Sequence, residues 1–452
     1  MLNKLFPFGL LGIISFIHVL VFTKLIYFPY PELFVYPYLT NHGLKPYSQI
    51  LDQHFPGLMF LPINLDNLGM NNEQSARIYS LAIIILIHIA LFVISYKILK
   101  SKSKALLVNC LFLLWNPFFE GWVLWIDSFL PLILLPNFYF LYKRNLFLSG
   151  LLLGIGVVFK QTLIPLAILV IIYLWWQNKR LKDALTFLEG LAIPVVLMII
   201  YFFSIGVIKD FWYWTVIFNL TTYAKFGTSA PVTIGFVTRV LVVYLPSLLL
   251  CLYKKDKRLV QILFIFLVGS LIGVFDRADF IHFQPSLPFA LLATTLGLFS
   301  IRRNNLLKMG LIFYIFITLW WQRIFYTGHI SSKVLLFDDN TKMIAQKIRQ
   351  YTEPSEKIFI FGVPPHLYQM ADRLPSGNIF VFQFPWFLKI AEPRILTGII
   401  SDKPNIIVSE RNAQIEGLQI KDFAPEIDSY IQQNYQVIER VGPTDIMRRK
   451  IP

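Results

Sequence analysis

Long apolar stretches recur along the first 322 residues of the chain and then stop. Some reach the roughly 20 consecutive apolar residues that a straight transmembrane helix needs, whereas others, such as 105–118 and 147–160, are shorter. The pattern predicts about eleven spans, the short ones being broken or dipping into the membrane without crossing it. No small-residue cleavage site follows the first span, so we expect it to be a retained anchor. The spans are expected near 5–27, 78–97, 105–118, 128–142, 147–160, 162–176, 184–205, 232–252, 259–275, 282–300 and 306–322.

The pattern changes after Gln322, where short strand-like runs alternate with helix-like ones. KIFIFG (357–362) and NIIVSE (405–410) are typical of buried strands, and HLYQMADR begins a helical pattern. IDSYIQQNYQVIERV (427–441) predicts a helix that runs into a third strand. These elements predict a small soluble α/β domain. Its sequence contains no Gly-rich phosphate loop, nucleophile elbow or metal-ligand cluster, so it does not disclose a chemistry.

Composition excludes an ordinary soluble globular protein, because 56% of the residues are hydrophobic and only 15% are charged. Lys and Arg outnumber Asp and Glu by 25 to 12 up to Gln322, but by only 16 to 14 after it. Most of the net charge of +15 therefore belongs to the membrane part. A nucleic-acid partner needs a basic soluble face. The nearly neutral tail offers none, so no nucleic-acid partner is expected.

Basic residues cluster in the connections on one side of the expected spans. Lys and Arg in short loops near span ends are retained in the cytoplasm, so we expect a multi-pass protein of the cell membrane with a cytoplasmic N-terminus. An odd number of spans then places the C-terminus outside. Residues 1–322 would form the transmembrane domain, with an outer loop at 28–77, and residues 323–452 an extracytoplasmic α/β domain. The clusters are Lys4; Lys97, Lys100, Lys102 and Lys104; Lys143 and Arg144; Lys179, Arg180 and Lys182; Lys254, Lys255, Lys257 and Arg258; and Arg302, Arg303 and Lys308.

The loop after the first span carries the first candidate site residues. Glu32 lies in PEL, and Asp52 and His54 lie in LDQHFPG, after GLKPY. An acidic group at the membrane surface is costly to desolvate unless it is paired or used, so these carboxylates are candidates for function. A solvated loop with turn-forming prolines explains the same composition equally well.

Two further groups lie at the ends of expected spans. In NPFFEGWVLWID, Glu120 marks the membrane interface beside a belt of tryptophans, whereas Asp127 stands directly before a long apolar run. Lys160 and Gln161 stand between two apolar runs with no acidic neighbour in the sequence. A snorkelling lysine and a lysine that neutralises a lipid phosphate are both compatible with that position.

The fourth group fills one tight outer turn, GVFDRADFIHFQPSLPF. Arg277 either pairs with Asp276 or binds a phosphate bidentately, with His282 as a second donor. Asp279 and Gln284 add polar side chains to the same turn.

The order of these groups resembles the GT-C superfamily of integral membrane glycosyltransferases. The similarity is to the bacterial branch that includes dolichyl-phosphate-mannose protein mannosyltransferases and the lipid A aminoarabinose transferase. The matching text is PEL, GLKPY and LDQHFPG, then GLLLGIGVVFKQT (150–162), RADFIHFQPSLP (277–288) and EPSEKIFIFGVPPHLYQMADRLPS (353–376). Where the family has Asp-Glu, this chain has Pro31-Glu32, so the family's catalytic acid corresponds to Glu32 or has moved to Asp52.

The resemblance implies a GT-C-like polytopic α-helical membrane protein that transfers a sugar from a polyprenyl-phosphate donor to an extracytoplasmic lipid, glycan or protein. Glu32 or Asp52 would take the acceptor's proton. The donor phosphate would be held by Lys160, Arg277 and His282, and the substrates would be contacted by Asp127, His54, Gln161 and Asp279. No nucleotide is required. No cofactor is certain, and a divalent metal near the carboxylates is compatible with the residues without being required by their spacing.

Two other classes fit part of the pattern. A flippase or polymerase of lipid-linked glycans also has many spans, but it would place its polar residues near mid-membrane on broken helices. A non-catalytic family member that binds a lipid phosphate would explain Pro31. The enzyme interpretation predicts that Glu32 and Asp52 converge with Lys160 and Arg277 on one outward cavity.

Overall fold

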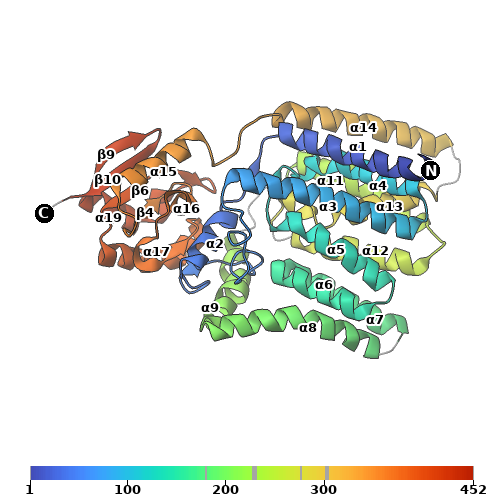
Figure 1. The fold of residues 1–452 in the computed structure, drawn as a ribbon, viewed down its shortest axis with the longest axis horizontal. Coiled ribbons are helices and arrows are strands. Elements are labelled where there is room, and N and C mark those ends of the chain that lie inside the picture. Colours follow the sequence, from blue (N-terminus) through green and yellow to red (C-terminus); the bar gives the residue numbers. More distant parts are fainter. Residues whose placement is uncertain (1, 179–180, 227–231, 275–276, 301–304, 451–452) are drawn as a thin grey trace. The chain divides into compact units, whose positions relative to one another are not determined.

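The computed structural model describes residues 2–178, 181–226, 232–274, 277–300 and 305–450, and its elements are labelled in Figure 1. The chain divides into two compact units, each assembled from three segments, and each is described by itself below. Unit 1 is Met1–Phe28, Ala76–Met198 and Thr228–Lys333; unit 2 is Pro29–Ser75, Ile199–Gly227 and Val334–Pro452. The compact units therefore do not follow the expected boundary after residue 322, because two earlier segments group with the tail.

Unit 1 consists almost entirely of apolar helices. Each expected span contains at least part of one, which agrees with a helical membrane protein. The helices are α1 (Leu2–Lys24), α3 (Glu73–Leu99), α4 (Lys102–Trp115), α5 (Ile126–Tyr142), α6 (Leu146–Phe159), α7 (Ile164–Asn178), α8 (Leu181–Ser204), α11 (Ile234–Tyr244), α12 (Lys257–Leu271), α13 (Leu287–Leu298) and α14 (Asn305–His329). Short elements link them: η1 (Pro117–Phe119), β3 (Val123–Leu124), η2 (Gln161–Leu163), η4 (Leu245–Leu252), η5 (Ile272–Val274) and η6 (Phe280–Phe283).

Helix length separates two classes among the described residues. Five segments are long and apolar enough to cross a membrane: Phe6–Lys24, Glu73–Leu99, Leu181–Ser204, Ile234–Leu252 and Lys257–Val274. Four apolar helices are shorter: Ile126–Tyr142, Leu146–Phe159, Gln161–Gln177 and Leu287–Leu298. The short apolar segments anticipated from the sequence are therefore short helices.

The core of unit 1 lies around α13. Every residue from Leu287 to Gly297 is buried, and the helix packs against α4, α12 and η4. A helix that is apolar on all sides belongs in an interior, which is where α13 lies.

Glycines in α6 allow its backbone to lie close to that of α8. A Cβ at Gly150 would lie 2.0 Å from the Phe187 carbonyl oxygen, and one at Gly154 would lie 2.4 Å from that of Leu191. Small residues four apart let helix backbones meet in this way. The GLLLG segment thus fixes α6, and with it the position of Lys160 at the end of that helix.

Unit 2 combines a four-stranded sheet with helices. In the order β4-β6-β10-β9, β4 runs parallel to β6 while β10 is antiparallel to both β6 and β9. The helices are α2 (Glu32–Asn41), α9 (Ile208–Trp212), α10 (Ala224–Phe226), α15 (Asp339–Tyr351), α16 (Leu367–Ala371), α17 (Pro385–Asp402), α18 (Ile420–Phe423) and α19 (Pro425–Asn434), with the π-helix η3 (Tyr213–Tyr223) and the one-turn η7 (Ser376–Asn378). The strands are β2 (Ile50–Leu51), β4 (Phe359–Phe361), β5 (Phe380–Val381), β6 (Ile406–Ser409), β7 (Gln414–Ile415), β8 (Leu418–Gln419), β9 (Tyr435–Val441) and β10 (Thr444–Arg449).

The segment expected to be an outer loop is structured and largely buried. It contains α2, and β2 pairs in parallel with β5 of the tail. The solvated-loop interpretation is therefore wrong for this part of the chain. The eight residues Glu32–Leu39 are all buried, so tertiary packing holds α2 together although Pro37 removes one of its backbone hydrogen bonds.

Candidate functional site

A buried cluster in unit 1 joins three residues that the sequence had placed in separate groups. Lys160 Nζ lies 2.6 Å from Asp127 Oδ2 and 3.0 Å from His282 Nδ1. His282 Nδ1 is also 3.2 Å from Asp127 Oδ2. The exposed fractions of the side chains are 8% for Lys160, 2% for Asp127 and 15% for His282. The three side chains therefore form one desolvated polar centre.

A break between two helices positions the lysine. Lys160 caps the C-terminus of α6 in an extended conformation, and the chain then continues through η2 into α7. Asp127 lies in the first turn of α5 and His282 in η6. The helix is therefore interrupted at the residue that contacts partners from two elements distant in the sequence.

The ion pair changes the interpretation of Lys160. The sequence showed no acidic neighbour, but Asp127 supplies one from 33 positions earlier, so the side chain does not simply snorkel. An ammonium group has three N–H donors; one points to Asp127, and His282 Nδ1 lies within hydrogen-bond distance of both Lys160 and Asp127. The lysine's charge is thus balanced in this structure.

Arg277 and Asp279 form a second ion pair in the turn before His282. Arg277 Nε lies 2.6 Å from Asp279 Oδ2, and both side chains are about one-third exposed. The predicted alternative partner, Asp276, lies outside the described residues. Gln161 is half-buried in η2, directly after Lys160. These residues therefore surround the same polar turn that the sequence indicated.

Glu120 belongs to this region and makes hydrogen bonds that its interpretation as an interface marker did not anticipate. Its Oε2 accepts a hydrogen bond from the backbone N–H of Ile281 at 2.9 Å, and Gln284 donates to the Glu120 carbonyl at 2.8 Å. Burial, with the negative charge of Asp279 as a smaller cause, raises the pKa of Glu120 to about 7. The turn after α4 and the turn before α13 are therefore tied together by a carboxyl that titrates near neutrality.

Arg239 on α11 was missed by the sequence reasoning. Its guanidinium carbon lies 4.1 Å from the ring centroid of Phe118 and 3.9 Å from that of Phe280, and it donates to the Phe118 carbonyl. A cation between two aromatic faces is attracted to both. The available signal was a lone arginine inside a stretch otherwise counted as an apolar span.

Unit 2 holds a second polar centre, built around Asp52. This residue is 1% exposed. Its Oδ2 accepts from the Tyr36 hydroxyl at 2.5 Å, while its Oδ1 accepts from both the backbone N–H and Nδ1 of His54, at 2.7 and 2.9 Å. The Asp52 carboxylate is therefore held in one orientation by a phenol and an imidazole.

Glu32 lies close enough to influence the same phenol. It is the first residue of α2 and is 7% exposed, and Tyr36 follows one turn later. The pKa of Tyr36 is raised well above its usual range by burial, and further by the negative charges of Asp52 and Glu32. Two carboxylates that are twenty positions apart in the sequence thus act on one hydroxyl group.

Hydrogen bonds from side chains to backbone carbonyl groups hold the loop that carries Asp52 and His54. The Tyr47 hydroxyl donates to the His54 carbonyl at 2.9 Å, and Asn219 Nδ2 donates to the Gln53 carbonyl at 3.0 Å. Tyr36 and Tyr47 went unnoticed in the sequence because aromatic residues there belong to the apolar pattern. Only the fold shows that their hydroxyl groups reach the acidic loop.

The structure assembles two centres, one in each unit. Glu32, Asp52 and His54 belong to unit 2, whereas Lys160 and Arg277, with the residues around them, belong to unit 1. The expected convergence of these groups on one cavity stays a prediction. In the part of the chain that the structure describes, no group of three or more His, Cys, Asp or Glu side chains is placed to hold a metal ion.

Comparison with known proteins adds no family assignment. No protein-family model matches the chain, and no curated protein matches its sequence.

Proposed function

We propose that the chain is an integral membrane glycosyltransferase that moves a sugar from a polyprenyl-phosphate donor to an extracytoplasmic acceptor. The observation that carries the proposal is the Asp52 centre. A buried carboxylate, oriented by Tyr36 and His54 and accompanied by Glu32, lies in the segment directly after the first apolar helix. The sequence resemblance expects a catalytic acid in that segment.

The chemistry assigns one role to each centre. The acceptor's hydroxyl oxygen attacks the anomeric carbon of the donor, and the bond from that carbon to the phosphate oxygen breaks. Glu32 or Asp52 takes the acceptor's proton. The polyprenyl phosphate leaves with the bonding electron pair, and its negative charge is stabilised by Lys160 and Arg277 with a hydrogen bond from His282.

The ion pair in unit 1 refines the expected role of Asp127. Because its Oδ2 lies 2.6 Å from Lys160 Nζ, Asp127 orients the lysine for the donor phosphate and is a positioning residue in this scheme.

The proposal includes a membrane arrangement. About eleven spans would place the N-terminus in the cytoplasm and the C-terminal α/β region outside, and the donor's polyprenyl chain would lie among membrane lipids. The alternation of basic connections along the sequence supports this arrangement.

A transfer assay with single variants identifies the base. Protein in liposomes is supplied with radiolabelled polyprenyl-phosphate sugars and a set of lipid, glycan and peptide acceptors. Removing a general base typically slows a reaction by ~10²- to 10⁴-fold. We expect a loss of that size in kcat from either Glu32→Gln or Asp52→Asn. Tyr36→Phe removes a hydrogen bond to Asp52 and leaves both carboxylates in place, so it should lower kcat less than either carboxylate substitution.

The same assay separates the other two classes. A flippase would move the donor across the bilayer without forming a glycosylated product. A non-catalytic lipid-phosphate binder would retain the donor in a pull-down, with Lys160→Met weakening that retention, and would also form no product. Either pattern, obtained with the full set of donors and acceptors, would replace the glycosyltransferase proposal.

A further inference from the structure

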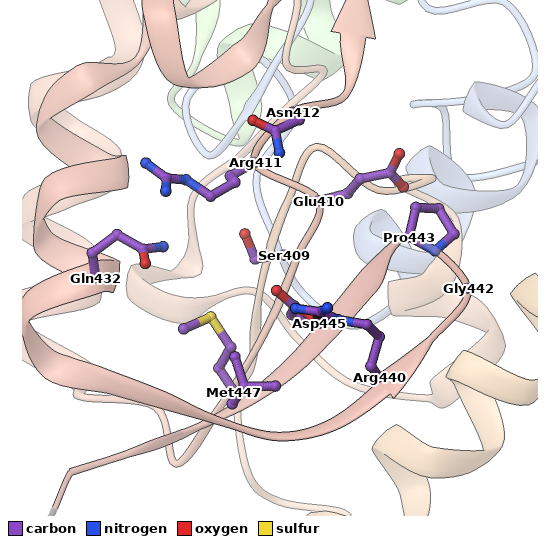
Figure 2. Close-up of a pocket in the computed structure, with 11 residues that line it drawn as sticks. Ser409, Glu410, Arg411, Asn412, Gln432, Arg440, Gly442, Pro443, Asp445 and Met447 are labelled. Carbon is purple, nitrogen blue, oxygen red and sulfur yellow. Dashed lines mark hydrogen bonds and ion pairs between the residues drawn. The ribbon is translucent and has the colours of Figure 1, made fainter.

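A cavity in unit 2 lies apart from the Asp52 centre, at the carboxyl end of β6. Its volume is about 550 Å³, within the ~300–1,000 Å³ typical of small-molecule sites. Figure 2 shows Ser409 at its centre, Gln432 from α19 on one side and Asp445 with Arg440 on the other. The carboxyl ends of parallel strands, such as β4 and β6, are a common place for ligands.

The pairing of β6, β10 and β9 places polar residues on one surface of the cavity and apolar residues on the other. Asp445 of β10 lies opposite Ser409 of β6 and opposite Arg440 of β9, which makes a polar row across three strands. Two positions further along β10, beyond a register shift between Ile446 and Met447, Met447 lies opposite Val437, which makes an apolar row. Side chains two apart on a strand share one face of the sheet. A ligand in the cavity would therefore meet an apolar floor beside a polar wall.

The charges of the lining are already balanced. Arg411 makes two hydrogen bonds to Asp428, at 3.0 and 2.6 Å, and Arg440 donates to Asp445 at 2.5 Å. Both guanidinium groups are therefore engaged by carboxylates, and a phosphate group would have to displace one of these carboxylates to bind. A nucleobase would find no ring to stack on, because the described residues that line the cavity include no aromatic side chain.

The remaining polar groups of the cavity are suited to hydrogen bonding with the hydroxyl groups of a ligand. Glu410, Asn412 and Gln432 also line the cavity, so its wall combines carboxylate acceptors, amide groups and guanidinium donors. Burial raises the pKa of Glu410, which indicates a partly desolvated carboxyl. A hydroxyl group both donates and accepts, so it matches such a mixed wall, and the C–H face of a sugar ring matches the floor of Val437 and Met447.

We propose that this cavity binds a neutral sugar unit, and that the sugar belongs to the acceptor glycan. The second clause rests on the proposed function, whereas the first does not. The wall residues select the hydroxyl pattern of the sugar.

Direct binding to the full-length protein tests the first clause. The protein is purified in a detergent without a sugar headgroup, and methyl glycosides of the common hexoses and N-acetylhexosamines are titrated by saturation-transfer NMR, with inorganic phosphate as the charged comparison. We expect at least one glycoside to bind and phosphate not to bind. Gln432→Ala and Asp445→Asn should weaken binding roughly tenfold, as expected for a lost hydrogen bond.

Matched variants guard against misfolding. Gln433→Ala makes the same change at the next residue of α19, which does not line the cavity, and should leave binding unchanged. Val437→Tyr should fill the cavity and abolish binding, whereas Gln436→Tyr at the next position of β9, which does not line the cavity, should not. The proposal is overturned if no glycoside binds the wild-type protein, or if binding survives Val437→Tyr.

The second clause has a separate readout. With transfer established, Gln432→Ala should raise the acceptor KM roughly tenfold and leave kcat near the wild-type value. Unchanged KM together with weakened glycoside binding would refute the acceptor role alone. Glycoside binding by a protein that transfers no sugar would refute the proposed function and leave the binding site standing.

Discussion

At the scale of single residues, the unit 1 centre is a buried ion pair with an imidazole beside it. Removing one partner of such a pair leaves an uncompensated charge in a desolvated place, whereas removing both can cost little. The contact between Asp127 and Lys160 therefore predicts strong coupling between their substitutions.

We expect Lys160→Met and Asp127→Leu each to destabilise the protein by about 3–5 kcal/mol. The double variant should be more stable than either single variant, because no charge remains buried. Thermal unfolding of the detergent-solubilised proteins measures this. Simply additive losses would show that the two side chains do not form the pair described here.

Glu120 makes a prediction about pH. Its pKa of about 7 in the folded protein lies above the ordinary value of 4.5, so the folded state binds this proton more tightly than the unfolded chain does. The contribution of Glu120 to the free energy of unfolding is therefore fully present below a pH of 4.5, and it is lost as the pH rises through about 7. Glu120→Gln keeps an oxygen acceptor for the Ile281 N–H and cannot titrate.

The melting temperature of the wild-type protein should therefore fall more than that of Glu120→Gln between about pH 5 and about pH 8. Unfolding scans of both proteins in the same buffers provide the comparison. Parallel curves would show that this carboxyl does not titrate in that window.

In the sequence, polarity against an apolar background was the signal that selected candidate residues, and their functional roles stay predictions. Asp52, Asp127 and Lys160 were selected on that ground, and all three are buried in polar centres. The hydrogen bonds of Glu120 were not anticipated, because a carboxylate beside tryptophans is typical of a membrane interface. Tyr36 could not be found, since its role depends on a hydroxyl that the apolar pattern conceals.

At the scale of elements, the contact between α6 and α8 positions Lys160 through the backbone. Adding a methyl group at Gly154 would bring it within 2.4 Å of a backbone oxygen of α8. We expect Gly154→Ala to destabilise the protein by about 1–3 kcal/mol, as overpacking does.

Gly12→Ala in α1 is the matched control, because nothing lies within 4 Å of its added carbon. That substitution should be neutral or stabilising, since alanine favours a helix over glycine by about 1 kcal/mol. Equal melting temperatures for the two variants would refute the close approach.

Elements with strong periodic patterns were predicted, and those stabilised by distant partners were not. The strands β4 and β6 and the passage from α19 into β9 lie where the sequence placed them. The short strands β2 and β5 were not predicted from the sequence. Each has two residues and exists only through pairing between positions more than 300 apart. The helix α2 was not predicted, because the prolines in its sequence are typical of a loop. The helix is stabilised by the burial of its side chains.

At the scale of the whole molecule, long-range pairing explains why the units do not follow the chain. Besides the pairing of β2 with β5, Lys342 forms an ion pair with Glu73 at 2.8 Å within unit 2. Neither the strand pairing nor the ion pair can be recognised from a pattern in the sequence. A boundary drawn where hydropathy changes therefore separates residues that fold together.

The proposed membrane arrangement predicts the side on which single cysteines are labelled. With Cys110 and Cys251 replaced by serine, Gln433→Cys should react with a membrane-impermeant maleimide in sealed right-side-out vesicles. Lys255→Cys should react only after the vesicles are opened, because basic connections stay in the cytoplasm. The reverse pattern would invert the orientation, and labelling of both in sealed vesicles would contradict the predicted alternation.

The central claim is that a carboxylate of the acidic segment takes the acceptor's proton during glycosyl transfer. The most direct test is the initial rate of transfer by the Glu32→Gln/Asp52→Asn double variant, compared with wild type under saturating donor and acceptor. The account predicts a fall of at least ~10²-fold in kcat, the smallest loss typical of a missing general base, with the folded fraction unchanged. A double variant that transfers sugar at the wild-type rate would contradict it.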